Sequence, residues 1–263
     1  GSSGMGKGAA KRFVEQGGRV LLCSRSAEKL ARAAAFIGGP PGAVETRSLD
    51  NTDEAQVKAF FAGLEADRYD VLVVSALGRA PHGGFLELDV AKARECMEGK
   101  LWGPWYCAKY GAPKLRDGGA IVFVSGFLGR RPGQNCAPLG ASNGAIEALT
   151  RTVALELGPR LRCNCLSPGF VDTERFDHLP SERKEAMLEA SADALPLKRV
   201  GQIDDIGEGI YFLATNRFTT GVVLDVDGGH QVRQYAMPND LYARLKRERE
   251  AADEAPAAKA ARA

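Results

Sequence analysis

Short apolar runs alternate with amphipathic helical patterns along most of the chain, and this alternation restricts the fold more than any other feature. Between the runs, apolar residues recur at i, i+3, i+4 and i+7, as in Leu30, Ala33, Ala34 and Ile37, which predicts helices with one buried face. Alternating strands and helices predict right-handed βαβ units, and therefore a mostly parallel sheet with helices on both sides. The predicted strands are residues 19–24, 43–49, 70–76, 120–125, 162–167 and 222–227.

Length and composition predict one α/β domain. A chain of 263 residues can bury a full core, and neither an internal repeat nor a Pro/Gly-rich linker divides it. We expect the domain to cover residues 1–244. Residues 245–263 are rich in Ala and charge and contain no aromatic residue, which predicts a disordered tail.

Charge and cysteine usage exclude several classes of function. The net charge of +2 argues against a dedicated nucleic-acid binder. No apolar run approaches the ~20 residues that a membrane-spanning helix needs. The six cysteines form no CxxC pair and no Cys/His cluster, which predicts no metal site and reduced thiols in a cytoplasmic protein.

The amino end carries a glycine-rich turn, GSSGMG, that leads directly into a helical pattern. Such a turn normally follows a strand, because the carboxyl end of that strand positions it against a phosphate. Two explanations are open: GSSG is a cloning remnant before Met5, or a native first strand is missing from the sequence. We favour the second, because the turn continues without interruption into the helix. A fold of this class without its central strand exposes two strand edges.

The same turn has the properties of a nucleotide-phosphate site. Glycines allow the backbone to approach a pyrophosphate closely, and a helix N-terminus supplies amide donors and a favourable dipole. The strand at 19–24 ends in Ser24-Arg25, where an NAD-preferring site normally has an acidic residue. An arginine there accommodates the 2′-phosphate, so the sequence predicts NADP(H). The alternative, a solvated charge at Arg25 without a ligand role, remains open.

In this order and spacing, the motifs resemble those of the short-chain dehydrogenase/reductase family, from residue 1 to about residue 230. GSSGMG is similar to the end of the family's TGxxxGxG turn, 75–78 to its NNAG segment, 167–173 to its PG…T segment and 226–229 to its VDGG. Ser125 stands at the end of the strand that carries the family's catalytic serine. The resemblance implies a Rossmann-type doubly wound parallel sheet and a small-molecule substrate. It implies cofactor contacts at Gly1, Ser2, Ser3, Gly4, Met5, Gly6, Ser24, Arg25, Asp50, Asn51, Ser75, Ala76, Leu77, Pro168, Gly169, Val171 and Thr173.

The chain departs from the family where the chemistry takes place. Anchoring the comparison on residues 141–145 puts Leu139 at the tyrosine and Asn143 at the lysine of the YxxxK motif. Lys100 stands where the family has a catalytic asparagine. Of the four usual catalytic residues, only Ser125 remains. Loss of a general acid typically costs ~10²–10⁴-fold in rate, and leucine donates no proton.

Other side chains are candidates for a role in catalysis. Asn143 still offers hydrogen bonds to a ribose, and Arg131 lies on the loop that borders the substrate in the family. Asp172 is a candidate partner for a cationic substrate, although a helix-capping role is simpler. His82 and His178 are candidate acids, although a lone histidine is usually an ordinary loop residue. We therefore predict catalytic contributions from Ser125, Asn143, Arg131 and Asp172.

Three functions follow from this arrangement. The first is reduction of an imine or iminium, which needs no Tyr/Lys pair and has a precedent among natural-product relatives of the family. The second is ketone reduction with a relocated acid, and the third is cofactor binding without turnover. The resemblance also implies a homodimer or homotetramer, assembled through helices around 92–115 and 138–157.

Overall fold

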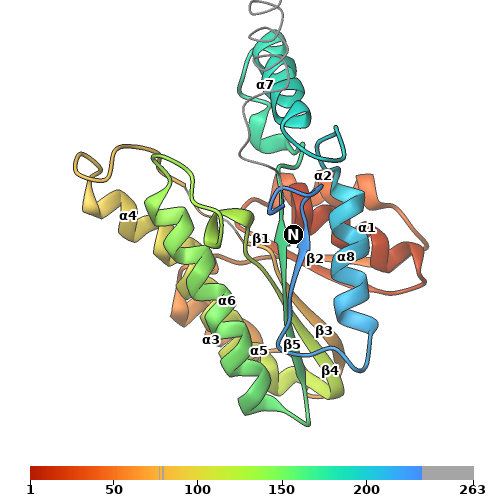
Figure 1. Ribbon diagram of the computed structural model, residues 1–263. Coiled ribbons are helices and arrows are strands. Elements are labelled where there is room, and N and C mark those ends of the chain that lie inside the picture. The colour runs from red at the N-terminus through yellow and green to blue at the C-terminus, as the bar shows by residue number, and fades with distance from the viewer. Residues whose placement is uncertain (77, 79, 233–263) are drawn as a thin grey trace, which may run out of the picture. The chain divides into compact units, whose positions relative to one another are not determined.

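Within the described part of the chain, six parallel strands form the framework of the computed structural model (Figure 1). The structure describes residues 1–76, 78 and 80–232. The strands are β1 (Val20–Ser24), β2 (Val44–Ser48), β3 (Tyr69–Val74), β4 (Leu115–Val124), β5 (Arg162–Pro168) and β6 (Val223–Val226). The helices are α1 (Gly4–Glu15), α2 (Ala27–Ile37), α3 (Glu54–Ala62), α4 (Val90–Met97), α5 (Gly103–Gly111), α6 (Ala137–Leu157), α7 (Ser181–Asp193) and α8 (Ile203–Thr215).

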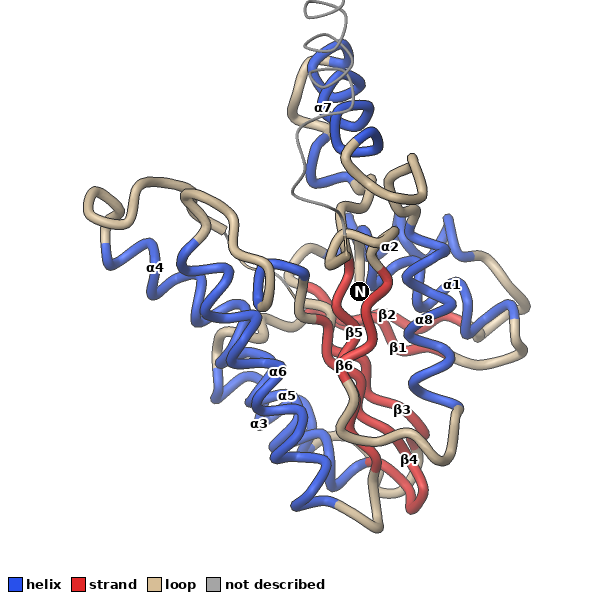
Figure 2. Tube along the Cα trace, in the orientation of Figure 1, coloured by secondary structure: helices blue, strands red, loops and turns tan. Residues whose placement is uncertain are grey.

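All strand pairs are parallel, in the orders β1-β2 and β3-β4-β5-β6. Helices cover both faces, as Figure 2 shows, with α3, α5 and α6 on one side and α1 and α8 on the other. This confirms the predicted Rossmann-type fold. The apolar faces of the helices pack on the strands because β4 and β5, in the middle, are buried on both sides.

Each predicted strand overlaps an observed one, and β4 begins earlier than predicted, at Leu115. Residues 1–231 belong to one compact unit. The predicted domain boundary at 244 and the tail at 245–263 lie outside the described residues. No helix in the part of the chain that the structure describes is both long and apolar enough to span a bilayer.

One edge of β1 and one edge of β3 lack a strand partner among the described residues. β1 pairs only with β2, and β3 pairs only with β4. On the other edge of β1, the amino group of Gly1 donates to the carbonyl of Cys23 at 2.9 Å. The glycine turn therefore lies directly against the β1 edge. The expectation of a further strand at this place stays a prediction.

Close contact between α1 and α8 depends on two glycines. A Cβ at Gly8 would overlap the backbone carbonyl of Ile203, and a Cβ at Gly207 would lie 2.6 Å from the carbonyl oxygen of Gly8. We expect Gly8→Ala to destabilise the fold by about 1–3 kcal/mol, because the two backbones must separate. Urea unfolding measures the change, with Gly63→Ala as the matched control, since its Cβ would meet nothing closer than 3.6 Å. Equal stability of the two variants would contradict this packing.

Candidate active site

The glycine turn, the ends of β1 and β3, and the segment after β5 meet at one edge of the sheet. The Ser2 hydroxyl donates to the Ser24 hydroxyl at 2.8 Å. A Cβ at Gly6 would overlap the Ser75 hydroxyl, and a Cβ at Gly4 would lie 3.3 Å from the Thr173 methyl group. The predicted cofactor residues of these segments are therefore neighbours. The carboxyl edge of parallel strands is where open α/β sheets bind ligands.

Glycine is required within this turn. Gly4 has φ +50, a left-handed conformation that side chains disfavour. At Gly6 there is no room for a side chain beside Ser75. Both positions agree with the prediction that the backbone here must approach another group closely.

A carboxylate already lies at the N-terminus of α1. Glu174 accepts a hydrogen bond from the Gly4 amide at 2.7 Å and a second from the Lys7 ammonium. Burial opposes ionisation, but the bonds from Lys7 and Gly4 hold the pKa of Glu174 below its ordinary value. Amide, dipole and ammonium together therefore form an anion site at this helix end. Sequence reasoning missed both Lys7 and Glu174, which lie 167 residues apart.

Arg25 follows β1 on the surface, near Asp50, a predicted cofactor contact that follows β2. The Ser48 hydroxyl donates to the Arg25 carbonyl at 3.2 Å. Burial opposes ionisation of Asp50, but hydrogen bonds from Thr52 and the charge of Arg25 hold its pKa below the ordinary value. Asn51 has a buried Nδ2 atom without a partner among the described residues. The structure thus brings Arg25 and Asp50 together, while the predicted contact at Leu77 lies outside the described residues.

One buried face of α6 carries three residues spaced four apart: Leu139, Asn143 and Glu147. They are 9%, 2% and 4% exposed. A Cβ at Gly126 would lie 3.0 Å from Asn143 Nδ2. The Oδ1 atom of Asn143 has no hydrogen-bond partner in the part of the chain described.

Ser125 is turned toward Glu147. Its hydroxyl donates to Glu147 Oε1 at 3.1 Å, and the residue is 4% exposed. A Cβ at position 126 would face the amide of Asn143. Sequence reasoning did not single out Glu147 as a partner of Ser125, and the predicted catalytic role of Ser125 stays a prediction.

The two arginines of the loop after β4 are engaged within the protein. Arg130 pairs with Glu147 at 3.1 Å and with Asp225 at 2.9 Å. Arg131 is 8% exposed and donates to the carbonyl of His230. Arg130 thus neutralises the buried Glu147 carboxylate, while the predicted substrate role of Arg131 stays a prediction.

The remaining candidates do not join the Asn143 group. Asp172 pairs with Lys184 at 3.1 Å, and His178 lies 2.9 Å from the carbonyl oxygen of Arg175. His82 Nδ1 lies 3.4 Å from the sulfur of Cys136, whose pKa is raised by burial. The predicted roles of Asp172 and the two histidines stay predictions.

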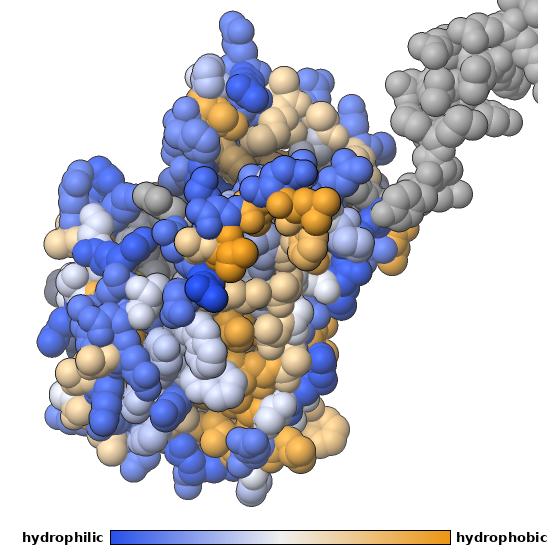
Figure 3. All heavy atoms as spheres, turned by 90° about the vertical axis from the view of Figure 1, so that its left-hand side faces the viewer, coloured by the Kyte–Doolittle hydropathy of each residue, from blue (hydrophilic) through white to orange (hydrophobic). Residues whose placement is uncertain are grey.

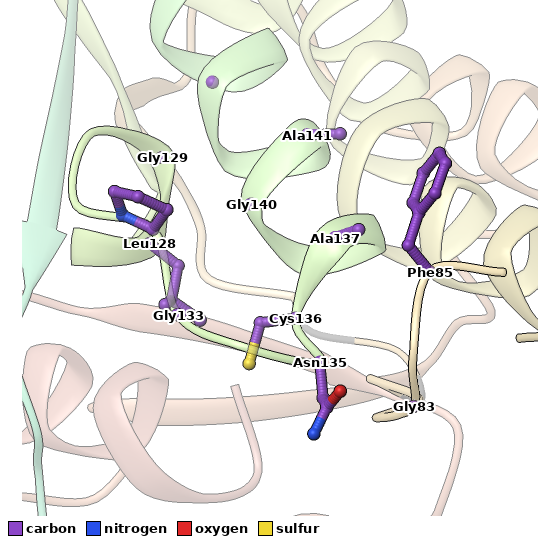
Figure 4. Close-up of a pocket in the computed structure, with 12 residues that line it drawn as sticks. Gly83, Phe85, Leu128, Gly129, Gly133, Asn135, Cys136, Ala137, Gly140 and Ala141 are labelled. Carbon is purple, nitrogen blue, oxygen red and sulfur yellow. The ribbon is translucent and has the colours of Figure 1, made fainter. Parts of the chain in front are cut away.

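Cys136 lines a pocket of about 570 Å³ beside the first turns of α6. Figure 4 shows its sulfur and the Phe85 ring on opposite sides of the helix start. The pocket borders a different face of α6 from the one that carries Leu139 and Asn143. Its lining residues are Gly83, Phe85, Leu128, Gly129, Pro132, Gly133, Asn135, Cys136, Ala137, Gly140, Ala141 and Gly144. No group of three or more His, Cys, Asp or Glu side chains within the described residues is arranged to hold a metal ion.

Lys100 is the most unusual residue near the site, and its importance was not predicted. It is 2% exposed and lies in a π-helical turn, η1 (Glu98–Trp102), that joins α4 to α5. Its ammonium donates to the carbonyls of Val124 at 2.8 Å and Ser125 at 3.0 Å. The signal in the sequence was a single charge within GKLWGPW, an otherwise uncharged stretch.

Comparison with known proteins agrees with this geometry. Residues 1–231 match the family described as Enoyl-(Acyl carrier protein) reductase. The chain is 34% identical over 239 residues to the galactitol 2-dehydrogenase (L-tagatose-forming) of Cereibacter sphaeroides. This match covers 88% of this chain and 92% of that enzyme. It is 30% identical to the 3-oxoacyl-[acyl-carrier-protein] reductase FabG of Thermotoga maritima, covering 87% of this chain and 94% of that protein.

A solved structure, a small-chain dehydrogenase in complex with NADPH, superposes with a TM-score of 0.71 at 33% identity, covering 81% of this chain and 98% of its own. The shared fold, the glycine turn at the sheet edge and these matches over nearly the whole domain lead to one conclusion. The chain belongs to the short-chain dehydrogenase/reductase family, whose members are oxidoreductases.

Proposed function

We propose that the protein is an NADP(H)-dependent oxidoreductase that reduces the carbonyl group of a small molecule, at a site without the family's tyrosine and lysine. Family membership supports the reaction class. The NADPH in the related solved structure and the arginine after β1 support the cofactor. The observation that carries the choice of a carbonyl is the buried positive charge of Lys100 below the end of β4.

The residues present fit the cofactor. The Gly4 amide and Lys7 form an anion site suited to a pyrophosphate, and Arg25 is exposed where the 2′-phosphate is expected. At the other end, Asn143 Oδ1 and Ser167 Oγ are buried without partners among the described residues. Buried polar atoms normally have partners, so these two are suited to a ribose and a carboxamide. The bound cofactor supplies the hydride.

The side chains at the site orient the substrate and do not protonate it. Leu139 is 9% exposed and donates no proton. Asn143 offers neutral hydrogen bonds, and Ser125 is held by Glu147. Water is the remaining source of the proton that the product oxygen needs.

Electrostatics separate the carbonyl from the iminium alternative. Addition of hydride to a carbonyl builds negative charge on oxygen, which a buried ammonium stabilises. An iminium arrives with positive charge, which the same ammonium repels. The iminium hypothesis stays a prediction, and Lys100 argues against it.

A screen of NADPH oxidation against matched ketones, aldehydes and preformed iminium ions tests the proposal. We expect turnover of a carbonyl compound with transfer of deuterium from labelled NADPH, and less turnover of its iminium counterpart. The reverse order would support the iminium hypothesis. Tight NADPH binding without turnover on the whole panel would support a cofactor-binding protein instead.

The contact of Glu174 with α1 leads to a prediction on cofactor affinity. Glu174 occupies the donors that a pyrophosphate needs, so binding must first displace it. We expect Glu174→Gln to lower the Kd for NADPH by ~3- to 10-fold, because the competing charge is gone. Fluorescence titration measures this change. Asp177→Asn is the control, since Asp177 pairs with Lys184 instead; an equal effect in both variants would contradict direct competition.

We also propose that the protein forms a homodimer through the face built by η1, α5 and α6. Figure 3 shows apolar side chains gathered on this side of the molecule. Trp102 (41% exposed), Trp105 (43%) and Leu155 (83%) contribute to the exposed apolar surface. Light scattering is expected to give twice the chain mass of 28.1 kDa. The variant Trp105→Glu is expected to give the mass of a single chain. A monomer at every concentration would exclude this interface.

A further inference from the structure

Lys100 is a buried cation without a carboxylate partner in the described part of the chain. Its ammonium makes hydrogen bonds only to the carbonyls of Val124 and Ser125 there. Burying an ammonium without a counter-ion costs stability, so packing alone does not explain the residue.

Local backbone geometry brings this charge to the end of β4. The π-helical turn η1 adds a bulge between α4 and α5, a feature that often marks functional sites. A Cβ at Gly99 would lie 2.7 Å from the Cα of Gly78, so only glycine allows this approach to the segment after β3. The neighbouring Lys100 side chain consequently reaches the carbonyls that end β4.

The carbonyl of Ser125 belongs to the peptide whose N–H is that of Gly126. A charged donor on the carbonyl polarises this peptide and makes its N–H a stronger donor. The Gly126 amide donates no hydrogen bond to any residue that the structure describes. Gly126 has no side chain to block an approaching oxygen, and it faces Asn143.

We propose that Lys100 is a positioning residue for carbonyl reduction, which holds and polarises the Ser125–Gly126 peptide so that the Gly126 N–H binds the substrate oxygen. The inference rests on the proposed function. Hydride adds to the carbonyl carbon, the π-electron pair moves to the oxygen, and the oxygen takes a proton from water. The Gly126 amide and the charge behind it stabilise the oxygen while it is negative.

The charge of Lys100 titrates within an accessible pH range. Burial lowers the pKa of Lys100 to about 8, so the charge is present at pH 7 and is lost as the pH rises through 8. Facing it are Cys165 on β5, Cys96 on α4 and Arg175. Burial raises the pKa of both thiols, which favours their neutral form. On the other side of Ser125, its hydroxyl is bonded to Glu147, which forms an ion pair with Arg130.

The test compares wild type with Lys100→Gln, which keeps a hydrogen-bond donor but loses the charge. With the best carbonyl substrate, wild-type kcat is expected to fall about tenfold between pH 7 and pH 9 as the charge is lost. At pH 7, Lys100→Gln is expected to lower kcat by ~10- to 100-fold and to remove this pH dependence, with the Kd for NADPH unchanged. Lys109→Gln is the control, because Lys109 lies exposed on α5 near Glu54. A flat wild-type profile, or an unchanged Lys100→Gln variant, would overturn the inference.

A binding measurement separates this inference from the proposed function. Acetate and benzoate, as stable oxyanions, are titrated into the complex with NADP⁺. Binding that weakens above pH 8 in wild type and is lost in Lys100→Gln supports the role of Lys100 even if no carbonyl is reduced. Binding that is independent of pH and of Lys100 overturns it, even if carbonyls are reduced.

Discussion

Replacing Arg25 with Asp is expected to raise the Kd for NADPH by ~100-fold, because one change removes a charge-assisted contact and places a carboxylate beside the 2′-phosphate. Arg25 is exposed at the end of β1, and its backbone position is held by the bond from Ser48. The fold should therefore tolerate the substitution. The Kd for NADH, which lacks this phosphate, is expected to change little.

Fluorescence titration with both cofactors measures the effect. Arg32→Asp on α2 is the matched control, because Arg32 is an exposed arginine that pairs only with Glu28 among the described residues. Equal loss of NADPH and NADH affinity in Arg25→Asp would show that Arg25 does not contact the phosphate.

The second large effect is expected from rebuilding a general acid. The variant Leu139→Tyr/Asn143→Lys places a hydroxyl and an amine, four residues apart, on the buried face of α6. Ser125 and Gly126 are left unchanged, because the Ser125 hydroxyl already points to Glu147 on the same helix and the open Gly126 amide is kept. We expect ketone reduction to increase by ~10²–10⁴-fold, the usual contribution of a general acid.

The control for this variant has Phe in place of Tyr at position 139, with Asn143→Lys kept. It fills the same space and lacks only the hydroxyl. Equal rates for the Tyr and Phe variants would show that no proton is donated from position 139. A folded Tyr variant that binds NADPH and stays inert would place the substrate elsewhere.

Local features of the sequence were sufficient to predict much of the fold. Strand runs and helical periodicity depend on neighbouring residues, and they placed all six described strands in a parallel α/β arrangement. The glycines of GSSGMG were also readable, because the need for a left-handed conformation at Gly4 belongs to the turn itself. The position of Arg25 after β1 follows from the same local pattern.

The site depended on contacts between distant segments. The partner of the Ser125 hydroxyl depends on how β4 ends against α6, and the sequence alone suggested Ser125 without its partner Glu147. The contact of Glu174 with Gly4 joins residues 170 positions apart, so no local pattern contains it.

The sequence by itself determined the parallel α/β fold, the glycine turn and the absence of tyrosine and lysine from positions 139 and 143, because these follow from residue identity and short-range periodicity. Only the tertiary structure decided that Lys100 is buried and that its ammonium reaches the last carbonyls of β4. A lysine is ordinarily solvated, and its burial depends on a π-helical turn and on the Gly78–Gly99 contact between separate segments. The sequence shows which side chains are charged. The strength of their electrostatic interactions at a site depends on how much water the surrounding fold excludes.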